Sequence, residues 1–423
     1  MSNMLNRTWH KGFYAYWFKE CGSLNYLLPM FIGVIVSVLV MIKGLTEALP
    51  FTICFTSICA FASVSWQSIR LQATEWHSLV PGYTDHIVKQ GNIIIVAPHV
   101  ILITSAIIFE QYAVLKLLSV SVLLGTLFYL KCRVTSKMFN TSAYFFFAII
   151  GFTIVFKEVP VWVATLAVTL NINVVLFRKH FGTAFKWQPQ ALVDYKHALQ
   201  SGWSPIPKGF LKGYGQGLNK FFFPLSYFMG RSLIQYTVLV LVIFVALLTL
   251  NYFYVAGRPS LFIFSNLVCI LAFMILWTRI QRQQAWATLI TLPIYSSVME
   301  AKINYAKASE KFALCIFVCS ALLAGFIEFI RFASPVFNLS MTYSLVNTAG
   351  VLICFAIGNV CKKSAFFSVA LVFTLGFVLA ITGIVVETEV EKLGIEHSAG
   401  ALIYLLFAIF ANRISSKQLY TNI

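Results

Sequence analysis

Long hydrophobic runs alternate with short polar segments along almost the whole chain. A helix needs about 20 residues to cross the hydrocarbon core of a bilayer. Two of the runs, 140–156 and 398–412, are shorter, which a tilted helix, a helical extension or a re-entrant segment would each explain. Twelve runs predict membrane spans: 24–42, 48–66, 93–109, 112–130, 140–156, 159–177, 233–256, 260–278, 312–330, 335–360, 364–386 and 398–412. The pattern therefore predicts an all-α polytopic membrane protein with about 12 transmembrane helices.

One polar stretch between these runs occurs twice. Residues 70–83 read RLQATEWHSLVPGY, and residues 282–295, which lie 212 positions later, read RQQAWATLITLPIY. In both copies an Arg-x-Gln begins eleven residues before a Pro-x-Tyr. Because the offset is close to half of the 423 residues, we infer a duplication. The fold expected is two tandem six-helix repeats in the same orientation.

Each half is expected to begin with a short helix that lies among the lipid headgroups. Apolar residues at helical spacing, with basic neighbours, form one face of such a helix. An ordinary aromatic belt ahead of a span is the alternative. The apolar positions are Trp9, Phe13, Tyr16 and Trp17 in the first half and, 212 residues later, Phe221, Leu225, Phe228 and Met229. We accordingly expect a first half at 1–180, a basic linker with the second interfacial segment at 181–232, and a second half at 233–423.

Composition agrees with a membrane protein and argues against nucleic-acid binding. The chain is 59% hydrophobic and 11% charged, which is more apolar surface than a soluble core can hide. Its net charge of +17 comes from cations scattered between hydrophobic runs, whereas a phosphate-binding face needs them clustered. The nine cysteines lie mostly inside the apolar runs, with no CxxC pair, and are expected to behave as buried hydrophobes.

The distribution of basic residues predicts the orientation. Cytoplasmic loops of membrane proteins carry an excess of Lys and Arg. Most of the 31 basic residues fall in the alternate loops that share a side with both termini. The exceptions are Lys43, Lys116, Lys157, Arg258, Arg331 and Lys392. We therefore expect a multi-pass protein of a bacterial inner membrane with both termini in the cytoplasm.

The two repeated loops carry the one family resemblance that we find. Leu79-Val80-Pro81-Gly82-Tyr83 and Thr291-Leu292-Pro293-Ile294-Tyr295 each place a proline where a helix must break, so a bend and a short helix across the membrane face are expected. This resembles the permease subunits of ABC-2-type exporters, whose loop between spans two and three is a coupling helix seated in the ATPase. Family members commonly have Ser-Arg soon after the proline, and this chain has Tyr83-Thr84-Asp85 and Tyr295-Ser296-Ser297 instead.

The resemblance implies that both loops couple the membrane helices to a cytosolic ABC ATPase dimer. No P-loop sequence is present, so ATP and Mg would be bound by that partner, and the chain itself would be neither an enzyme nor a cofactor protein. Plain connectors left by the duplication are the alternative. The expected coupling residues are Arg70, Gln72, Glu75, Trp76, Leu79, Pro81, Tyr83, Asp85, Arg282, Gln284, Trp286, Leu292, Pro293, Tyr295 and Glu300.

Few ionisable residues approach the apolar runs. Glu110 and Glu328 occupy corresponding outer ends, where they would line an exit vestibule or simply face the interface. His99, next to Pro98 near the start of the third run, is expected to be a hydrogen-bonded interfacial histidine, not a proton relay. We find no catalytic constellation and no metal-ligand spacing. The function expected is export of an amphipathic or lipid-like substrate, and a twelve-span secondary transporter or a lipid or oligosaccharide flippase is the alternative. A membrane enzyme of glycolipid assembly would need acid, base or metal groups that the sequence does not offer.

Overall fold

The protein is an all-α polytopic membrane protein, and over the residues described it contains helices and no strand. Its structure is a computed structural model. Hydrophobic runs form helices because a helix satisfies every backbone hydrogen bond within the segment, which the bilayer interior requires. The structure describes residues 12–44, 49–75, 79, 82–141, 159–176, 187–201, 215–229, 231–254, 258–282, 284–291, 294–331, 338–361, 364–387 and 394–419.

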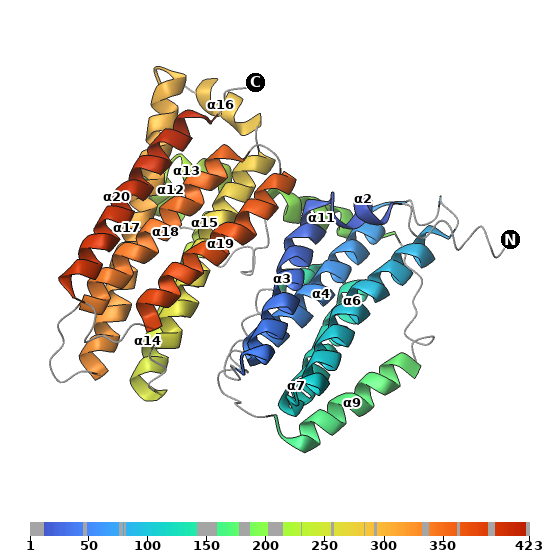
Figure 1. The fold of residues 1–423 in the computed structure, drawn as a ribbon. Coiled ribbons are helices and arrows are strands. Elements are labelled where there is room, and N and C mark those ends of the chain that lie inside the picture. Colours follow the sequence, from blue (N-terminus) through green and yellow to red (C-terminus); the bar gives the residue numbers. More distant parts are fainter. Residues whose placement is uncertain are drawn as a thin grey trace. The chain divides into compact units, whose positions relative to one another are not determined.

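The chain forms two compact units, residues 1–199 and 200–423 (Figure 1). In the first unit, a short helix at the start is followed by four long helices, and a helix from the central loop closes the unit. The elements are α2 (Phe13–Trp17), α3 (Cys21–Ile42), α4 (Leu49–Ala73), α6 (Tyr83–Ile108), α7 (Tyr112–Val134), the 3-10 helix η1 (Ser136–Thr141), α9 (Val161–Leu176) and α11 (Pro189–Ser201).

The second unit begins in the same way, with short helices ahead of long ones. Its helix α13 covers residues 225–229, which is the span of α2 displaced by 212 positions. The elements are α12 (Gly215–Phe221), α13 (Leu225–Met229), α14 (Arg231–Tyr254), α15 (Arg258–Gln281), α16 (Gln284–Thr291), α17 (Val298–Arg331), α18 (Asn338–Val360), α19 (Ser364–Glu387) and α20 (Ile395–Lys417).

In the described part of the chain, ten helices are long and apolar enough to cross a membrane, against the twelve expected. Most of the run at 140–156 lies outside the described residues. The run at 159–177 gives α9, which has 16 residues and is shorter than a span. The short run at 398–412 is part of a full-length helix, because α20 extends it at both ends to 23 residues.

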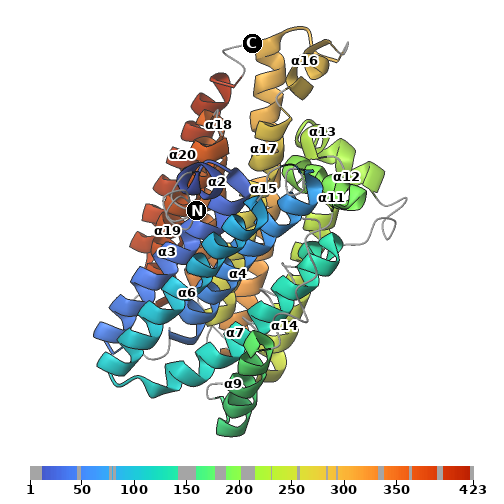
Figure 2. The ribbon, with the colours of Figure 1, turned by 90° about the vertical axis from the view of Figure 1, so that its right-hand side faces the viewer.

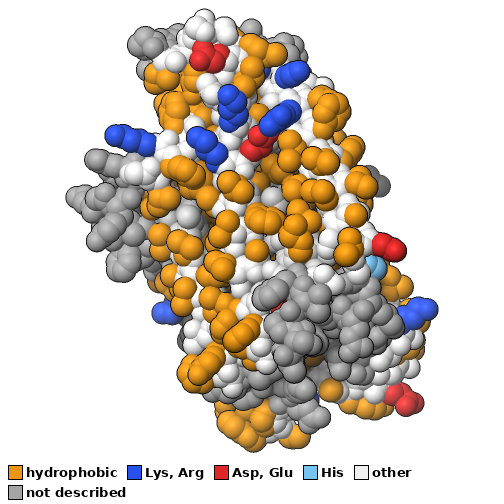
Figure 3. Space-filling model, turned by 90° about the vertical axis from the view of Figure 1, so that its left-hand side faces the viewer, with side chains coloured by type: hydrophobic (Ala, Val, Ile, Leu, Met, Phe, Trp, Pro, Cys, Tyr) orange, Lys and Arg blue, Asp and Glu red, His pale blue; other side chains and the backbone are white. Residues whose placement is uncertain are grey.

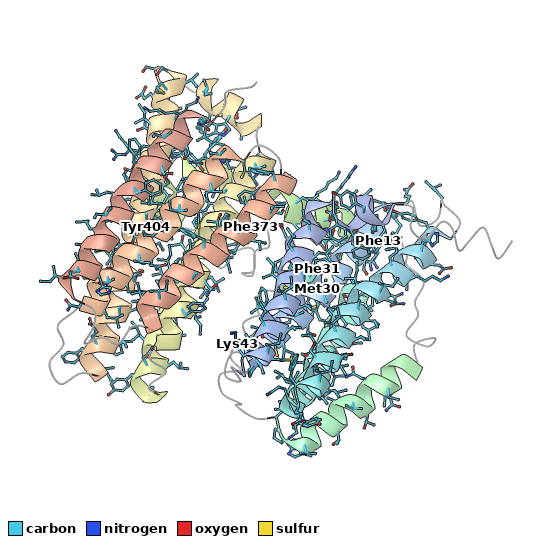
Figure 4. All side chains as sticks on the ribbon, viewed as in Figure 1. Phe13, Met30, Phe31, Lys43, Phe373 and Tyr404 are labelled. Carbon is cyan, nitrogen blue, oxygen red and sulfur yellow. The ribbon has the colours of Figure 1, made fainter. Side chains whose placement is uncertain are left out.

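Hydrophobic side chains cover the surface that would face lipid. Figure 3 shows them over the middle of one face, with Lys and Arg gathered toward the upper part. On α20 the exposed apolar residues include Leu402, Leu406 and Phe410, which follow one another at helical spacing. In Figure 4, Phe13 and Lys43 lie toward opposite ends of the first unit, as expected if α3 crosses the bilayer between them.

The most buried spans are α4 in the first unit and α18 in the second. Both carry small polar residues that bond to neighbouring helices, which is how helices associate where lipid removes the hydrophobic driving force. Asn347 Nδ2 of α18 donates to Ser320 Oγ of α17 at 2.7 Å. Tyr343 Oη of α18 donates to the carbonyl of Leu261 in α15, also at 2.7 Å. Six of the eight cysteines described are buried, as expected of small hydrophobes, whereas Cys315 and Cys319 are half-buried.

The predicted linker at 181–232 is divided between the two units. Its helix α11 docks on the first unit, where the amide of Gln188 donates to the carbonyl of Gln72 at 3.0 Å. Asp194 accepts a hydrogen bond of 2.6 Å from Ser136 Oγ of η1. The helices α12 and α13 pack instead within the second unit, beside α14 (Figure 2). Phe222, which lies between them, contacts Phe312 of α17. The described parts of this segment are therefore helices packed on one unit or the other.

Candidate functional site

The first copy of the repeated stretch packs against the short helix α2, the segment that is expected to lie among the lipid headgroups. The guanidinium carbon of Arg70, in the last turn of α4, lies 4.8 Å from the centroid of the Tyr16 ring. Tyr83, the first residue of α6, meets the same ring edge to face at 6.2 Å. Burial, and then the neighbouring Tyr83, raise the pKa of Tyr16 well above its usual range, so the phenol is neutral at physiological pH. The Arg and the Tyr of the motif thus hold one aromatic residue of α2 between them.

The second copy holds its own interfacial helix with the corresponding residues. Arg282 Nη1 donates a hydrogen bond of 2.8 Å to the carbonyl of Phe228 in α13. Phe228 is Tyr16 displaced by 212 positions, so both arginines contact equivalent residues. Tyr295 stacks on Phe223, with centroids 6.2 Å apart and planes inclined by 12°. We call each set of contacts a clamp: Arg70 and Tyr83 on Tyr16 in the first unit, and Arg282 on Phe228 with Tyr295 on Phe223 in the second.

The clamps were missed by sequence reasoning, which assigned these residues to a partner. The available signal was that the interfacial segments and the Arg-to-Tyr stretches share one offset of 212 residues. Elements that keep their spacing after a duplication are candidates to contact each other. The contacts themselves come from helix packing, which the one-dimensional pattern does not give.

Two more of the expected coupling residues point into their units. Gln72 is buried, and its Nε2 donates to the carbonyl of Arg133 at the end of α7 at 2.7 Å. Trp286 of α16 is buried against Phe228 and Tyr305, with ring centroids 4.9 and 5.6 Å apart. These residues fix the loops onto the long helices and leave little of themselves for a partner to touch.

Other members of the expected set lie on the surface. Leu79 has 68% of its side chain exposed, and Glu75 and Asp85 are exposed on either side of it in the sequence. In the second copy Ile294 is 56% exposed, beside the half-buried Tyr295. An exposed apolar residue between acidic neighbours is a feature that a protein partner can recognise.

Glu300 has a structural role at the start of α17. Its carboxylate accepts hydrogen bonds from the amide and the hydroxyl of Ser296, at 2.7 and 2.6 Å. In return the amide of Glu300 donates to Ser297 Oγ at 3.2 Å. This reciprocal pattern resembles a capping box, which satisfies amides that the first turn of a helix leaves unpaired.

Four residues of the expected set lie outside the described part of the chain: Trp76, Pro81, Leu292 and Pro293. Gln284 is the first residue of α16, and its side chain is not described. A short helix was expected after the bend at Pro293, but the short helix α16 (Gln284–Thr291) precedes this position. The described residues 294–297, which follow the proline, are not helical, and the next helix is the long α17.

A polar network joins the first clamp to α11. Glu20 Oε2 accepts hydrogen bonds from the amide of Ser23, at 2.7 Å, and from the indole of Trp66, at 2.8 Å. Gln67 Nε2 donates to the carbonyl of Tyr16 at 2.9 Å. Tyr195 of α11 lies on Trp66, with ring centroids 5.0 Å apart. The Glu20 carboxylate therefore caps α3 and bonds Trp66 of α4. Through Trp66 it also connects α11 of the central loop to the end of the unit that carries α2.

Glu110 and Glu328, expected at corresponding outer ends, have different environments. Glu110 is exposed in the turn between α6 and α7, in a left-handed conformation with a φ of 56°. Glu328 of α17 is 0% exposed and accepts hydrogen bonds from the amides of Leu339 and Ser340, at 2.9 and 3.1 Å. It therefore caps the N-terminus of α18, and this structural role explains why a carboxylate is buried at this position.

His99 is hydrogen-bonded inside the first unit, as expected. Its Nδ1 lies 2.6 Å from the carbonyl of Ile95, and its Nε2 lies 2.9 Å from Ser57 Oγ of α4. A carbonyl can only accept, so Nδ1 carries the proton and Nε2 accepts from the serine. Among the residues described, no group of three or more His, Cys, Asp or Glu side chains could hold a metal ion.

Comparison with known proteins adds no relative: no family model matches the chain, and neither a curated protein nor a solved structure matches it. The candidate site of this multi-pass membrane protein is therefore defined by its own geometry, as a pair of loops that are each clamped to an interfacial helix.

Proposed function

We propose that this chain is the membrane-spanning permease subunit of an ABC exporter of the ABC-2 type, in a bacterial inner membrane with both termini in the cytoplasm. Separate ABC ATPase subunits, which bind ATP and Mg, would dock on its two repeated loops. The substrate class that suits such a permease is amphipathic or lipid-like. The chain contributes no catalytic residue to this activity.

The observation that carries the proposal is the pair of clamped loops. A loop that receives force from a partner can transmit it only if the loop is fastened to the helices that must move. Arg70 and Tyr83 fasten the first loop to α2, and Arg282 and Tyr295 fasten the second to α13 and its preceding residues. Two equivalent loops would suit a dimer of ATPase subunits.

Within the first loop the two tasks fall to different residues. The inward side chains of Arg70, Gln72 and Tyr83 hold the loop in place. The outward side chains of Glu75, Leu79 and Asp85 would meet the partner. Displacing Leu79 would move α6 directly, because α6 begins only four residues later at Tyr83.

The experiment is purification of the tagged chain from native membranes, with identification of co-purifying nucleotide-binding proteins. We expect an ABC ATPase with the wild type and its loss with the double variant Leu79→Glu and Asp85→Lys. Ile395→Glu is the matched control, because Ile395 is 83% exposed at the start of α20 and belongs to neither loop. Recovery of no ATPase with the wild type, or equal ATPase stimulation by the double variant, would overturn the proposal.

A secondary transporter or a flippase is the second candidate, and one observation favours it. Glu328 and Arg279 are buried ionisable residues at the ends of spans of the second unit, and buried ionisable residues in membrane proteins often mark ion or substrate routes. The two candidates differ in their energy source. Uptake into sealed vesicles that depends on an imposed proton gradient, without ATP, would support the second candidate and exclude the first.

A further inference from the structure

The end of the second unit that carries α13 contains a buried cation that no carboxylate of the described residues pairs with. Arg279, in the last turn of α15, is 6% exposed. Its Nη2 donates a hydrogen bond of 2.8 Å to the carbonyl of Gly358 in α18. Its Nε has no partner among the residues described. A guanidinium offers five donors, and the Nε–H of this one is left over.

A second buried cation and an unpaired hydroxyl lie on α17, which packs against α15. Lys302 of α17 is 8% exposed, and its Nζ donates to the carbonyl of Lys417 at the end of α20 at 2.9 Å. One turn further along α17, Tyr305 is 0% exposed, and its hydroxyl has no partner in the described structure. Tyr305 lies against Phe228, whose carbonyl accepts the hydrogen bond from Arg282, three residues after Arg279. The groups that can donate to an anion therefore lie on the adjoining ends of α15 and α17.

Local helix ends neutralise only part of this charge. Arg279 meets the last turn of α18, and Lys302 meets the last residue of α20. A helix C-terminus supplies the equivalent of roughly half a negative charge. Two full positive charges thus remain incompletely compensated, and a buried charge is costly unless it is paired.

The corresponding place in the first unit has a neutral residue and an internal carboxylate instead of an unpaired cation. Gln67 lies three residues before Arg70, as Arg279 lies three residues before Arg282. Gln67 is neutral, and it belongs to the network around the Glu20 carboxylate. The residue displaced from Glu20 by 212 positions is Ser232. The duplicated position has therefore gained a cation in the second unit, where the acidic residue is absent.

The depth of the cluster in the membrane indicates which anion is available. Arg279 follows the apolar run 260–278 directly, and Lys302 and Tyr305 precede the run 312–330. The helix α17 has 34 residues and is about 50 Å long, whereas the hydrocarbon core is about 30 Å thick. Its first turns therefore extend beyond the core to the level of the lipid phosphates.

We propose that Arg279, assisted by Lys302 and the hydroxyl of Tyr305, binds the phosphate of an anionic amphiphile at this end of the second unit. Arginine suits the task because its planar fork matches the oxygens of a phosphate, and Nε and an Nη together can bind two of them. The site does not depend on a docked ATPase, so it stands apart from the proposed export function.

The test measures ligand binding by the purified full-length chain in detergent. Phosphatidylglycerol in mixed micelles is one probe and inorganic phosphate is the other, and both are read by native mass spectrometry and by Tm. We expect phosphatidylglycerol to bind and to raise Tm. Arg279→Gln should weaken its binding about tenfold or more, as expected for loss of a charge-assisted hydrogen-bond pair. Arg413→Gln is the control, because Arg413 is exposed and already pairs with Glu310 at 2.6 Å.

The possible outcomes distinguish a lipid phosphate from a free phosphate, and a binding role of Arg279 from a purely structural one. Binding of inorganic phosphate alone that is lost in Arg279→Gln would keep the site but assign it to a free anion. No binding of either probe, or equal binding by the variant, overturns the proposal. In lipid-free detergent Arg279→Met should lower Tm about as much as Arg282→Met, since each variant loses one hydrogen bond to a backbone carbonyl. A much larger fall in Tm for Arg279→Met would instead assign Arg279 to capping α18 and overturn the site.

Discussion

The two units repeat one device and differ in how each of them handles buried charge. In both, an arginine at the end of a long helix fastens the short helix at the start of the unit: Arg70 covers the Tyr16 ring, and Arg282 donates a hydrogen bond to the Phe228 carbonyl. In the first unit the adjacent polar residues close around the Glu20 carboxylate. In the second, Arg279 and Lys302 are buried against backbone carbonyls.

The comparison separates what the two units share from what differs between them. The clamp is shared, and it determines how α2 or α13 and the following loop sit on the long helices. The charged residues around it differ, since a polar cluster can be satisfied by an internal carboxylate or, as we propose for the second unit, by an external anion. The first unit is therefore a reference for the second, and each variant below tests one part of the comparison.

The largest effect is expected at Glu328. Replacing it by Ala leaves the amides of Leu339 and Ser340 without their acceptor in a buried position. The expected loss is about 3 kcal/mol of unfolding free energy, since each buried unsatisfied group costs about 1–3 kcal/mol. Glu110→Ala, at the exposed position expected to correspond, should change stability by about 0.5 kcal/mol or less. Denaturant unfolding in detergent measures both, and equal losses would contradict the different roles.

A smaller loss is expected at Glu20 in the first unit. Glu20→Ala removes the cap of α3 and the acceptor of the Trp66 indole, at a cost of about 2 kcal/mol. Because Tyr195 of α11 also packs on Trp66, the central loop should be cleaved faster by protease. Glu396→Ala, at the exposed start of α20, is the control. Cleavage at the wild-type rate would show that α11 does not depend on this network.

Variants of the clamp arginines should show the next largest loss of unfolding free energy. Arg282→Met should cost about 1.5 kcal/mol, because it removes a charge-assisted hydrogen bond to the Phe228 carbonyl. Arg70→Met should cost about 0.5–1 kcal/mol, the usual range for a cation on an aromatic ring at a partly exposed site. Both keep the aliphatic stem, so lost packing is small. The order of the two denaturation midpoints checks the comparison, and the reverse order would count against it.

The smallest effect is expected at the loop acids. Glu300→Ala should lower Tm slightly, because the carboxylate caps α17 through Ser296. Glu75→Ala should lower Tm by no more than this, because Glu75 is exposed beyond the end of α4 and exposed substitutions usually change stability by about 0.5 kcal/mol or less. If the coupling proposal is right, Glu75→Lys should reduce recovery of the ATPase while Tm falls no further than in Glu75→Ala. A much larger fall in Tm for Glu75→Lys would place this residue among the structural contacts.

The sequence by itself determined the class of protein and much of its organisation. Hydrophobic runs of span length predict membrane helices because the bilayer demands about 20 apolar residues from each. The 212-residue offset predicts the interfacial helices, and α2 and α13 begin and end at equivalent positions. The count of spans was less accessible, since α9 is 16 residues long although its apolar run is 19 residues long.

Only the tertiary structure decided which loop side chains contact the rest of the protein and which are exposed. Arg70 and Glu75 read alike as charges on a polar loop, yet one covers Tyr16 and the other is exposed. Glu110 and Glu328 likewise share a predicted position, and only Glu328 meets the start of another helix. The reason is physical: periodicity reports which residues avoid water along one helix. The partner of a polar side chain depends on which helix packs beside it.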